Sequence, residues 1–318
     1  MPPRRKFGKR LIRAFLPIVL VLLLALGGSL ALIVSGVARP TKRAYLVTPQ
    51  SFQQFSGSAL KLTDEFWSNS DGTRARGWLI KGAEGAPAVV LLHRYGADRS
   101  WLLNLAVKIH ETTGFTILCP DLRGHGLDPP VKWTSFGARE GRDLLDALDF
   151  LRTLKADKQA KLVADKFGVY GVELGAYAAI SAAQRNDQIK TLVLDSVPRA
   201  PDDLLQAAVA SDVGVDVEAL QYFSRTAIKL YLMGAYENAS ACDLAASLQN
   251  QHILLLSGPD AGALKDATSK LAQCFPNQAN VESRLDLPLS GLNLPSATGE
   301  QGEAYDRIVI EFFDRYLR

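Results

Sequence analysis

Residues 167–180 read Phe167-Gly-Val-Tyr-Gly-Val-Glu-Leu-Gly-Ala-Tyr-Ala-Ala-Ile180, and this stretch decides the fold. Its apolar first part predicts a buried strand, and its alanine-rich second part predicts a helix. Gly171 and Gly175 flank Glu173 at the junction. A strand that turns sharply into a helix needs glycine at such positions, because a Cβ there would clash with the neighbouring strand or helix. The stretch therefore predicts Glu173 in strained backbone geometry at a helix N-terminus. An ordinary strand–helix turn without chemistry is the alternative.

Short apolar runs with β-branched residues recur on both sides of this turn and predict further strands that are buried on both faces. These runs are Ala88–Leu92, Phe115–Cys119, Thr191–Leu194 and Ile253–Leu256. Helical patterns lie between them, and the clearest covers residues 139–154, with leucines on one face and charges on the other. Ser70-Asp71-Gly72 separates two more strand-like segments and predicts a hairpin turn. This alternation predicts an α/β fold with a mostly parallel central sheet flanked by helices.

The beginning of the chain predicts a membrane anchor. Residues 14–38 carry no charge and would span about 37 Å as a helix, against about 30 Å of hydrocarbon. Residues 1–13 form a basic tail with six Lys and Arg, which favours a cytoplasmic N-terminus and an extracytoplasmic main domain. A signal peptide cleaved after Ala38 is the alternative. The apolar run is longer than the usual signal-peptide core of about 7–15 residues, so we favour an uncleaved, single-pass signal anchor.

The rest of the chain predicts a linker at residues 39–49 and one domain at residues 50–318. Residues 201–250 are helical and lack a strong strand, which predicts a cap-like insertion. With the tail set aside, 30 of the 36 Lys and Arg residues remain against 33 Asp and Glu, so the domain has no basic excess for binding nucleic acid. Cys242 and Cys274 could pair in an oxidising compartment, but the sequence leaves this open.

Three motifs follow one another along the predicted domain. A strand ends in His93-Arg94-Tyr95-Gly96, which is similar to the pattern His-Gly-x-Gly. Asp121-Leu-Arg-Gly-His125-Gly126 matches the loop D-x-R-G-H-G, and Gly171-Val-Glu-Leu-Gly175 stands where a G-x-S-x-G turn is expected. In this order the motifs resemble the α/β-hydrolase superfamily, especially its lysophospholipase-like and serine-aminopeptidase-like members. The resemblance covers most of the chain after the linker and implies the α/β-hydrolase fold.

The resemblance also implies positions for the site. Glu173 occupies the position of the nucleophile, and the backbone amides of Tyr95 and Leu174 occupy the positions of the oxyanion hole. Asp260, in Ser257-Gly-Pro-Asp260, occupies the position of the catalytic acid, although a simple turn aspartate is the favoured alternative. No cofactor is implied.

The chain departs from this family at the residues that perform its chemistry. A glutamate cannot supply the alkoxide that the serine mechanism needs. Some members of the fold use an aspartate nucleophile, but Glu173 is one methylene longer. The family's histidine follows the last strand, whereas here none follows residue 252; the chain's four histidines are His93, His110, His125 and His252.

A third departure points to compensation. The family's glycine after His93 is Arg94. We expect the Glu173 carboxylate to fill the anion-binding position itself, held by the Leu174 N–H, the helix dipole and Arg94. His93 and His125 lie at the same edge of the predicted sheet as Glu173, and the three could be imagined as metal ligands. In ordinary family members these two histidines are structural, so we expect no metal.

Two functions remain open on these grounds. The first is a membrane-anchored binding or scaffold module that lacks Ser-His-Asp catalysis, with the bilayer as partner through residues 14–38 and an unknown small molecule or protein as ligand. The second is an atypical hydrolase of esters, amides or lipid-like substrates that uses Glu173. An enzyme should present an open pocket at Glu173 with a base in reach, and a scaffold should have that pocket filled.

Overall fold

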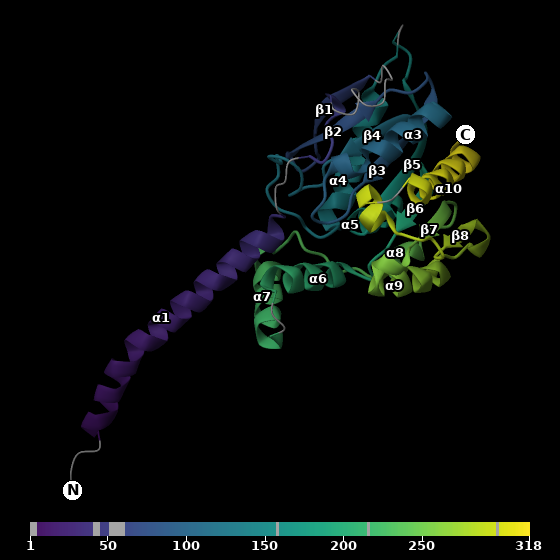
Figure 1. The fold of residues 1–318 in the computed structure, drawn as a ribbon. Coiled ribbons are helices and arrows are strands. Elements are labelled where there is room, and N and C mark those ends of the chain that lie inside the picture. The colour runs from purple at the N-terminus through teal and green to yellow at the C-terminus, as the bar shows by residue number, and fades with distance from the viewer. Residues whose placement is uncertain (1–4, 41–44, 51–60, 157–158, 215–216, 297–298) are drawn as a thin grey trace.

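The structure, a computed structural model, describes residues 5–40, 45–50, 61–156, 159–214, 217–296 and 299–318. It consists of a long N-terminal helix and a domain built around a sheet (Figure 1). The predicted basic tail is described only from Arg5 onwards. Residues 41–44 of the predicted linker, and residues 51–60 at the start of the predicted domain, lie outside the described residues.

An eight-stranded sheet forms the centre of the domain, in the order β1-β2-β4-β3-β5-β6-β7-β8. β2 is antiparallel to both β1 and β4, and the other five neighbouring pairs are parallel. The predicted α/β class with a mostly parallel sheet is therefore confirmed. The strands are β1 (Leu62–Ser68), β2 (Arg74–Ile80), β3 (Ala86–Leu92), β4 (Thr116–Pro120), β5 (Val163–Val172), β6 (Ile189–Asp195), β7 (His252–Leu256) and β8 (Val281–Arg284).

The predicted apolar runs lie in these strands to within one residue. Every residue of β4 is buried, as expected for a strand covered on both faces. The predicted hairpin turn joins β1 to β2, and Gly72 supplies its left-handed residue with φ +78°. β8 has no apolar run and is partly exposed, which explains why the sequence pattern does not single it out.

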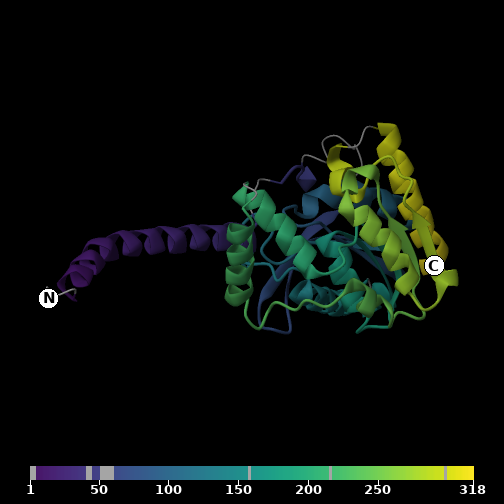
Figure 2. The ribbon, with the colours of Figure 1, turned by 90° about the horizontal axis from the view of Figure 1, so that it is seen from below.

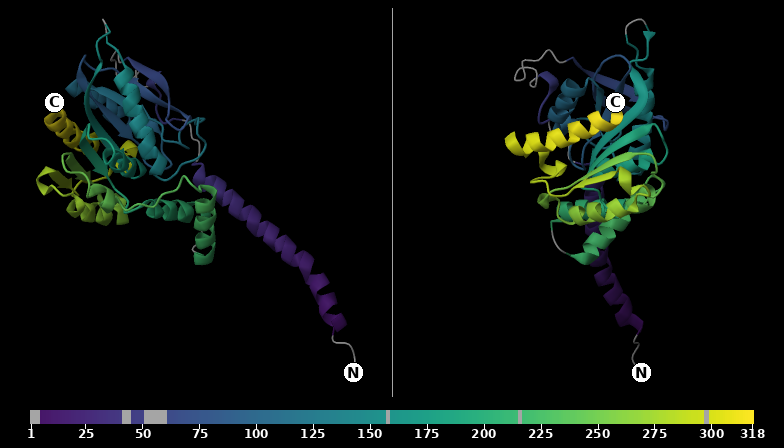
Figure 3. Two further views of the ribbon diagram at one scale, coloured as in Figure 1. Left: turned by 180° about the vertical axis from the view of Figure 1, so that it is seen from behind. Right: turned by 90° about the vertical axis from the view of Figure 1, so that its right-hand side faces the viewer.

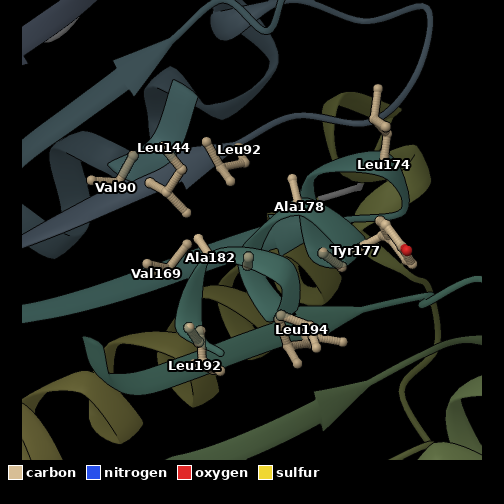
Figure 4. Packing of buried hydrophobic residues seen from close by; sticks show 14 of the residues in the cluster. Val90, Leu92, Leu144, Val169, Leu174, Tyr177, Ala178, Ala182, Leu192 and Leu194 are labelled. Carbon is tan, nitrogen blue, oxygen red and sulfur yellow. The ribbon is translucent and has the colours of Figure 1, made fainter. Parts of the chain in front are cut away.

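Two layers of helices cover the sheet (Figures 1 and 3). One face packs against α4 (Ala138–Thr153) and α5 (Leu174–Ala183), and the other against α3 (Leu103–Thr113) and α10 (Gly299–Leu317). Figure 4 shows the first of these layers, in which Leu144 of α4 and Ala178 and Ala182 of α5 lie over the strands. Small alanines on α5 let this helix approach the sheet closely.

Residues 201–250 hold α6 (Pro201–Val213), α7 (Glu218–Tyr231) and α8 (Ala241–Ala245). In agreement with the sequence pattern, the described part of this segment contains helices and no strand. Cys242, in α8, forms a disulfide with Cys274, which ends a 3₁₀ turn after α9 (Ala263–Leu271), and their Cα atoms lie 5.2 Å apart. The two cysteines whose pairing the sequence leaves open therefore form a disulfide. Cys119 is a buried free thiol.

The N-terminal helix α1 (Arg5–Ala38) extends away from the domain (Figures 1 and 2). Its segment Arg13–Ala38, 26 residues, is long and apolar enough to cross a membrane. The end of α1 is part of the domain, because Val37 and Ala38 are only 1% and 0% exposed. There α1 packs against α6 and α7, and a Cβ at Gly36 would lie 2.7 Å from an Asp212 carboxylate oxygen.

Candidate functional site

The turn between β5 and α5 has the sharp geometry that its glycines predict. Glu173 has φ +52° and ψ −105°, a strained conformation for a residue with a side chain. A Cβ at Gly171 would lie 2.5 Å from the Gly175 carbonyl carbon, and one at Gly175 would lie 2.4 Å from the Leu92 carbonyl oxygen. Both glycines are therefore required for the contact of α5 with its own strand and with β3.

The Glu173 side chain folds back onto backbone amides. Its Oε2 accepts a hydrogen bond from the Tyr95 N–H at 2.9 Å. Burial raises the pKa of Glu173, and hydrogen bonds from the amides of Tyr95 and Leu174 oppose this rise. The carboxylate thus lies at the two amides that the sequence resemblance assigns to an oxyanion hole.

Arg94 acts on this carboxylate mainly through charge and loop geometry. Its guanidinium lies over the Trp101 ring, 4.5 Å from the ring centroid, and donates to the Tyr95 carbonyl at 3.1 Å. The positive charge of Arg94 lowers the pKa of Glu173, against the larger effect of burial. Arg94 therefore both holds the loop that carries the Tyr95 amide and places a positive charge near Glu173. The compensated exchange of glycine for arginine remains a prediction.

His93 and His125 are built into their own loops. The Nδ1 of His93 bonds to the Arg94 carbonyl at 2.8 Å, and its Nε2 accepts from the Leu122 N–H at 3.0 Å. The Nδ1 of His125 bonds to the Arg123 carbonyl at 2.9 Å, and its ring packs edge-on against Tyr95. Burial lowers the pKa of His93 to about 4 and that of His125 to about 3, so both are neutral near pH 7.

In the described part of the chain, no histidine hydrogen-bonds to Glu173. His110 bonds to the Phe115 carbonyl, and His252 stacks on Tyr316 at the opposite end of its strand. With both nitrogens of His93 already engaged, that ring cannot bind a metal without losing a hydrogen bond. Among the residues that the structure describes, no group of three His, Cys, Asp or Glu side chains could hold a metal ion.

Asp260 holds the loop that follows β8. Its carboxylate accepts from the Ser290 N–H at 2.8 Å, from the Ser290 hydroxyl at 2.9 Å and from the Asn293 amide at 2.7 Å. The family's histidine would be expected in this loop, and here the aspartate binds serine and asparagine instead. These contacts fit the interpretation of Asp260 as a structural turn residue.

A second buried carboxylate lies beside the turn, and the sequence arguments missed it. Asp195 ends β6 next to Val172, its carbonyl accepts the Glu173 N–H at 2.9 Å, and its side chain accepts from the Tyr305 hydroxyl at 2.7 Å. The amide of Gly291 donates to the same carboxylate at 2.9 Å. Burial raises the pKa of Asp195 to about 6. An available signal was its position directly after the apolar run of β6, at the edge where ligands bind in parallel sheets.

A cavity of about 620 Å³ opens above Glu173. Its volume lies within the usual range of about 300–1,000 Å³ for small-molecule sites. Besides Glu173, its walls come from the loop 94–98 with Trp101, from α6, and from Gly36 and Pro40 at the end of α1. Asp212 of α6 also lines it, and partial burial raises the pKa of this carboxyl group. The pocket at Glu173 is thus open, as expected for an enzyme and contrary to the filled pocket expected for a scaffold. None of the four histidines, all of which the structure describes, hydrogen-bonds to Glu173 as a base.

Comparisons with known proteins agree with this fold. A family model described as the alpha/beta hydrolase family matches residues 89–271. A thiohydrolase of Aspergillus aculeatus is 25% identical over 150 residues, which is 47% of this chain and 44% of that protein. The chain therefore aligns with less than half the length of that relative.

Solved structures resemble the chain over a larger part of its length. An esterase of Pyrococcus furiosus has a TM-score of 0.65 and 18% identity, covering 88% of this chain and 98% of that one. An alpha/beta hydrolase of a Penicillium species has a TM-score of 0.58 and 16% identity, covering 81% and 99%. An acylaminoacyl peptidase of Pyrococcus horikoshii has a TM-score of 0.60 and 17% identity, covering 86% and 44%. At these identities the likeness concerns the fold.

Proposed function

The chain belongs to the alpha/beta hydrolase family. Within this family, we propose that it is a membrane-anchored binding module that has no Ser-His-Asp catalysis. The observation that carries the proposal is the hydrogen bond from the Tyr95 N–H to the Glu173 carboxylate. An oxyanion hole must be empty to receive a substrate oxygen, and its donors each contribute about 10²–10³ in rate. In this chain the Tyr95 N–H already donates to the Glu173 carboxylate, so this donor is taken.

The absence of a partner base supports the same proposal. Each of the four histidines lies in the described structure, and none hydrogen-bonds to Glu173. Glu173 has no serine-type hydroxyl that could act as the nucleophile, and no described histidine is hydrogen-bonded to it as a base. The open cavity beside Glu173 is then a ligand site, with Arg94, Asp98, Glu173 and Asp212 as its charged lining residues. A small molecule or a segment of a protein is its proposed occupant.

The second candidate function is an atypical hydrolase of esters, amides or lipid-like molecules. The open cavity favours it, because an enzyme must admit its substrate to the group that acts on it. Burial raises the pKa of Glu173, and a carboxyl group with a raised pKa in a cleft is the kind of group that serves as a general acid or base.

We further propose that α1 anchors the domain on the outer side of a membrane, with the basic tail in the cytoplasm. The end of the helix argues against a removable leader, because the carbonyl of Val37 accepts from the Tyr95 hydroxyl at 2.8 Å and that of Ala38 from the Thr134 N–H at 3.0 Å. The disulfide between Cys242 and Cys274 supports an oxidising compartment for the domain.

The test compares the full chain in detergent with its Glu173→Gln and Glu173→Ser variants on activated esters, thioesters, amides and lysophospholipids. We expect no turnover above buffer for any of the three, and saturable binding of at least one compound to the native chain. Glu173→Ser serves as a control, because a serine without a histidine should also be inactive. Turnover by the native chain that Glu173→Gln abolishes would contradict the binding module and establish the hydrolase.

A further inference from the structure

Helix α7 leaves several large apolar residues exposed, which is unusual for a helix at the surface of a soluble domain. It buries Ser224 and Ile228, whereas Tyr222 is 60% and Leu230 is 65% exposed. A surface helix normally turns its apolar stripe toward the core, because burying that stripe stabilises the fold. The packing of α7 within the chain therefore does not account for its apolar side chains.

Six exposed apolar side chains lie on α7 or within two residues of its ends, and we name them the α7 apolar surface. It consists of Val217, Tyr222, Phe223, Leu230, Tyr231 and Met233. Outside α1, the part of the chain that the structure describes exposes nine large apolar side chains, and these six are among them. A gathering of this kind marks a contact with a partner or a membrane, whereas single exposed residues need no explanation.

The basic side chains of α7 turn toward α6. Lys229 forms an ion pair with Asp202 at 2.8 Å, and Arg225 donates to the Gln206 side chain at 3.5 Å. These contacts place the long basic residues between the two helices.

Helix α7 lies beside the end of the apolar helix α1. Figures 1 and 3 show α7 standing next to the end of α1, on the side of the domain from which α1 departs. The two helices enclose an apolar groove of about 580 Å³. It is lined by Leu30, Ala31, Val34 and Ser35 of α1, by Arg39, and by Ala227, Leu230 and Tyr231 of α7. Arg39 bridges its upper end with a hydrogen bond to the Tyr231 hydroxyl at 3.1 Å.

The depth of this groove follows from helix geometry. Leu30 lies eight residues before the end of α1, which is about 12 Å along the helix axis. If Arg13–Ala38 crosses the hydrocarbon, α7 lies at the level of the outer headgroups and the first part of the acyl chains. Tyrosine and phenylalanine favour that layer, since their rings have apolar faces and tolerate water at one edge.

We propose that the α7 apolar surface is seated in the lipid of the same bilayer that α1 crosses, as a second membrane contact of the domain. The inference rests on the proposed membrane anchoring, and it extends the lipid-facing surface of α1 onto the neighbouring helix. It also fixes the orientation of the domain. The cavity at Glu173, with Gly36 and Pro40 in its wall, then opens close to the headgroup layer.

The experiment places a fluorescent probe on single introduced cysteines in the full chain, reconstituted in phosphatidylcholine vesicles. The probe site is Phe223→Cys in α7. Phe66→Cys is the matched control, an exposed aromatic position on the edge strand β1, which lies away from α7 (Figure 1). Leu23→Cys marks the middle of α1. Labelling is selective, because Cys119 is buried and the other two cysteines form a disulfide.

We expect nitroxide lipids with a shallow label to quench the probe at position 223, and aqueous iodide to quench it only weakly. At position 66 we expect the reverse, and at position 23 quenching by deeply labelled lipids. Strong iodide quenching at 223 with lipid quenching at 23 would overturn the second contact and leave the anchor intact. Loss of lipid quenching at 23 would overturn the anchor itself. Protection of 223 from both iodide and nitroxide lipids would mean that a second copy of this chain covers the position, and it would overturn the lipid assignment.

Discussion

Glu173 keeps a backbone conformation that costs about 1–3 kcal/mol for a residue with a Cβ. Two backbone hydrogen bonds hold it, because its N–H donates to the Asp195 carbonyl and its carbonyl accepts from the Tyr177 N–H. The turn was predictable from the sequence, since its determinants, Gly171 and Gly175, lie within two residues. The partner of the side chain, the Tyr95 amide, lies 78 residues away along the chain, so only the family resemblance and no local pattern indicated it.

At the same scale, Asp195 makes a prediction about pH. Burial raises its pKa from the ordinary value of 3.8 to about 6, so the folded state binds its proton more tightly than the unfolded state. Between about pH 4 and pH 6 the unfolded chain is deprotonated and the folded chain is not, and stability falls as the pH rises. Asp195→Asn removes this effect. We expect the variant to gain about 2 kcal/mol relative to the native chain from pH 4 to pH 6, measured by denaturant unfolding of both.

The comparison between the two proteins isolates Asp195 from other titrating groups. His93, whose pKa is lowered to about 4, and Asp143, whose pKa is raised to about 6, titrate identically in both chains and cancel in the difference. A difference that stays constant over this pH range would show that Asp195 is already ionised in the folded state at low pH. The Asp195–Tyr305 contact itself was beyond the sequence, because it joins β6 to a helix more than 100 residues later.

Among the elements, the contact of α5 with β3 is the tightest part of the turn. The Cβ of a Gly175→Ala variant would lie 2.4 Å from the Leu92 carbonyl oxygen, so α5 must move away from the sheet. We expect a loss of about 1–3 kcal/mol in the free energy of unfolding, measured by chemical denaturation. Gly299→Ala in α10 is the matched control, because nothing lies within 4 Å of a Cβ there. Equal stability of the two variants would show that the helix gives way without cost.

The elements of the sheet were predictable because burial on both faces leaves a continuous apolar run in the sequence, as in β3, β4 and β7. β8 and the first half of β5 were not, since exposed residues such as Lys166 interrupt their pattern. The helical character of residues 201–250 was also predictable. Which way α7 turns its apolar side chains was not, because that depends on packing against α6 and α1.

In the whole molecule, the cavity at Glu173 is assembled from segments that are distant in sequence. The loop 94–98, α6 and the end of α1 each supply part of its lining. The sequence resemblance located the loop and Glu173, since these belong to family motifs. It gave no indication that residues 36–40 complete the wall, because the chain before the predicted domain carries none of those motifs.

This arrangement predicts that two shortened chains differ in stability. A chain lacking residues 1–34 keeps Val37 and Ala38 and their hydrogen bonds to Tyr95 and Thr134, whereas a chain lacking residues 1–44 loses them. We expect the shorter chain to be less stable by about 3–5 kcal/mol, from one buried valine and two hydrogen bonds. Thermal unfolding of both, in the same detergent, measures the difference. Identical midpoints would mean that the contacts of Val37 and Ala38 do not stabilise the domain.

The hydrogen bond between Val37 and Tyr95 also sets an order of events during synthesis. Its two residues are separated by 58 positions, and those of the bond from Arg39 to Tyr231 by 192. Because the ribosome releases the chain from its N-terminus, α1 is made long before the residues that receive it. A nascent chain that ends after β6 already contains both α1 and Tyr95, but α6 and α7, which pack against α1, are still missing. The last wall of the cavity is therefore completed late, around a helix that is already in place.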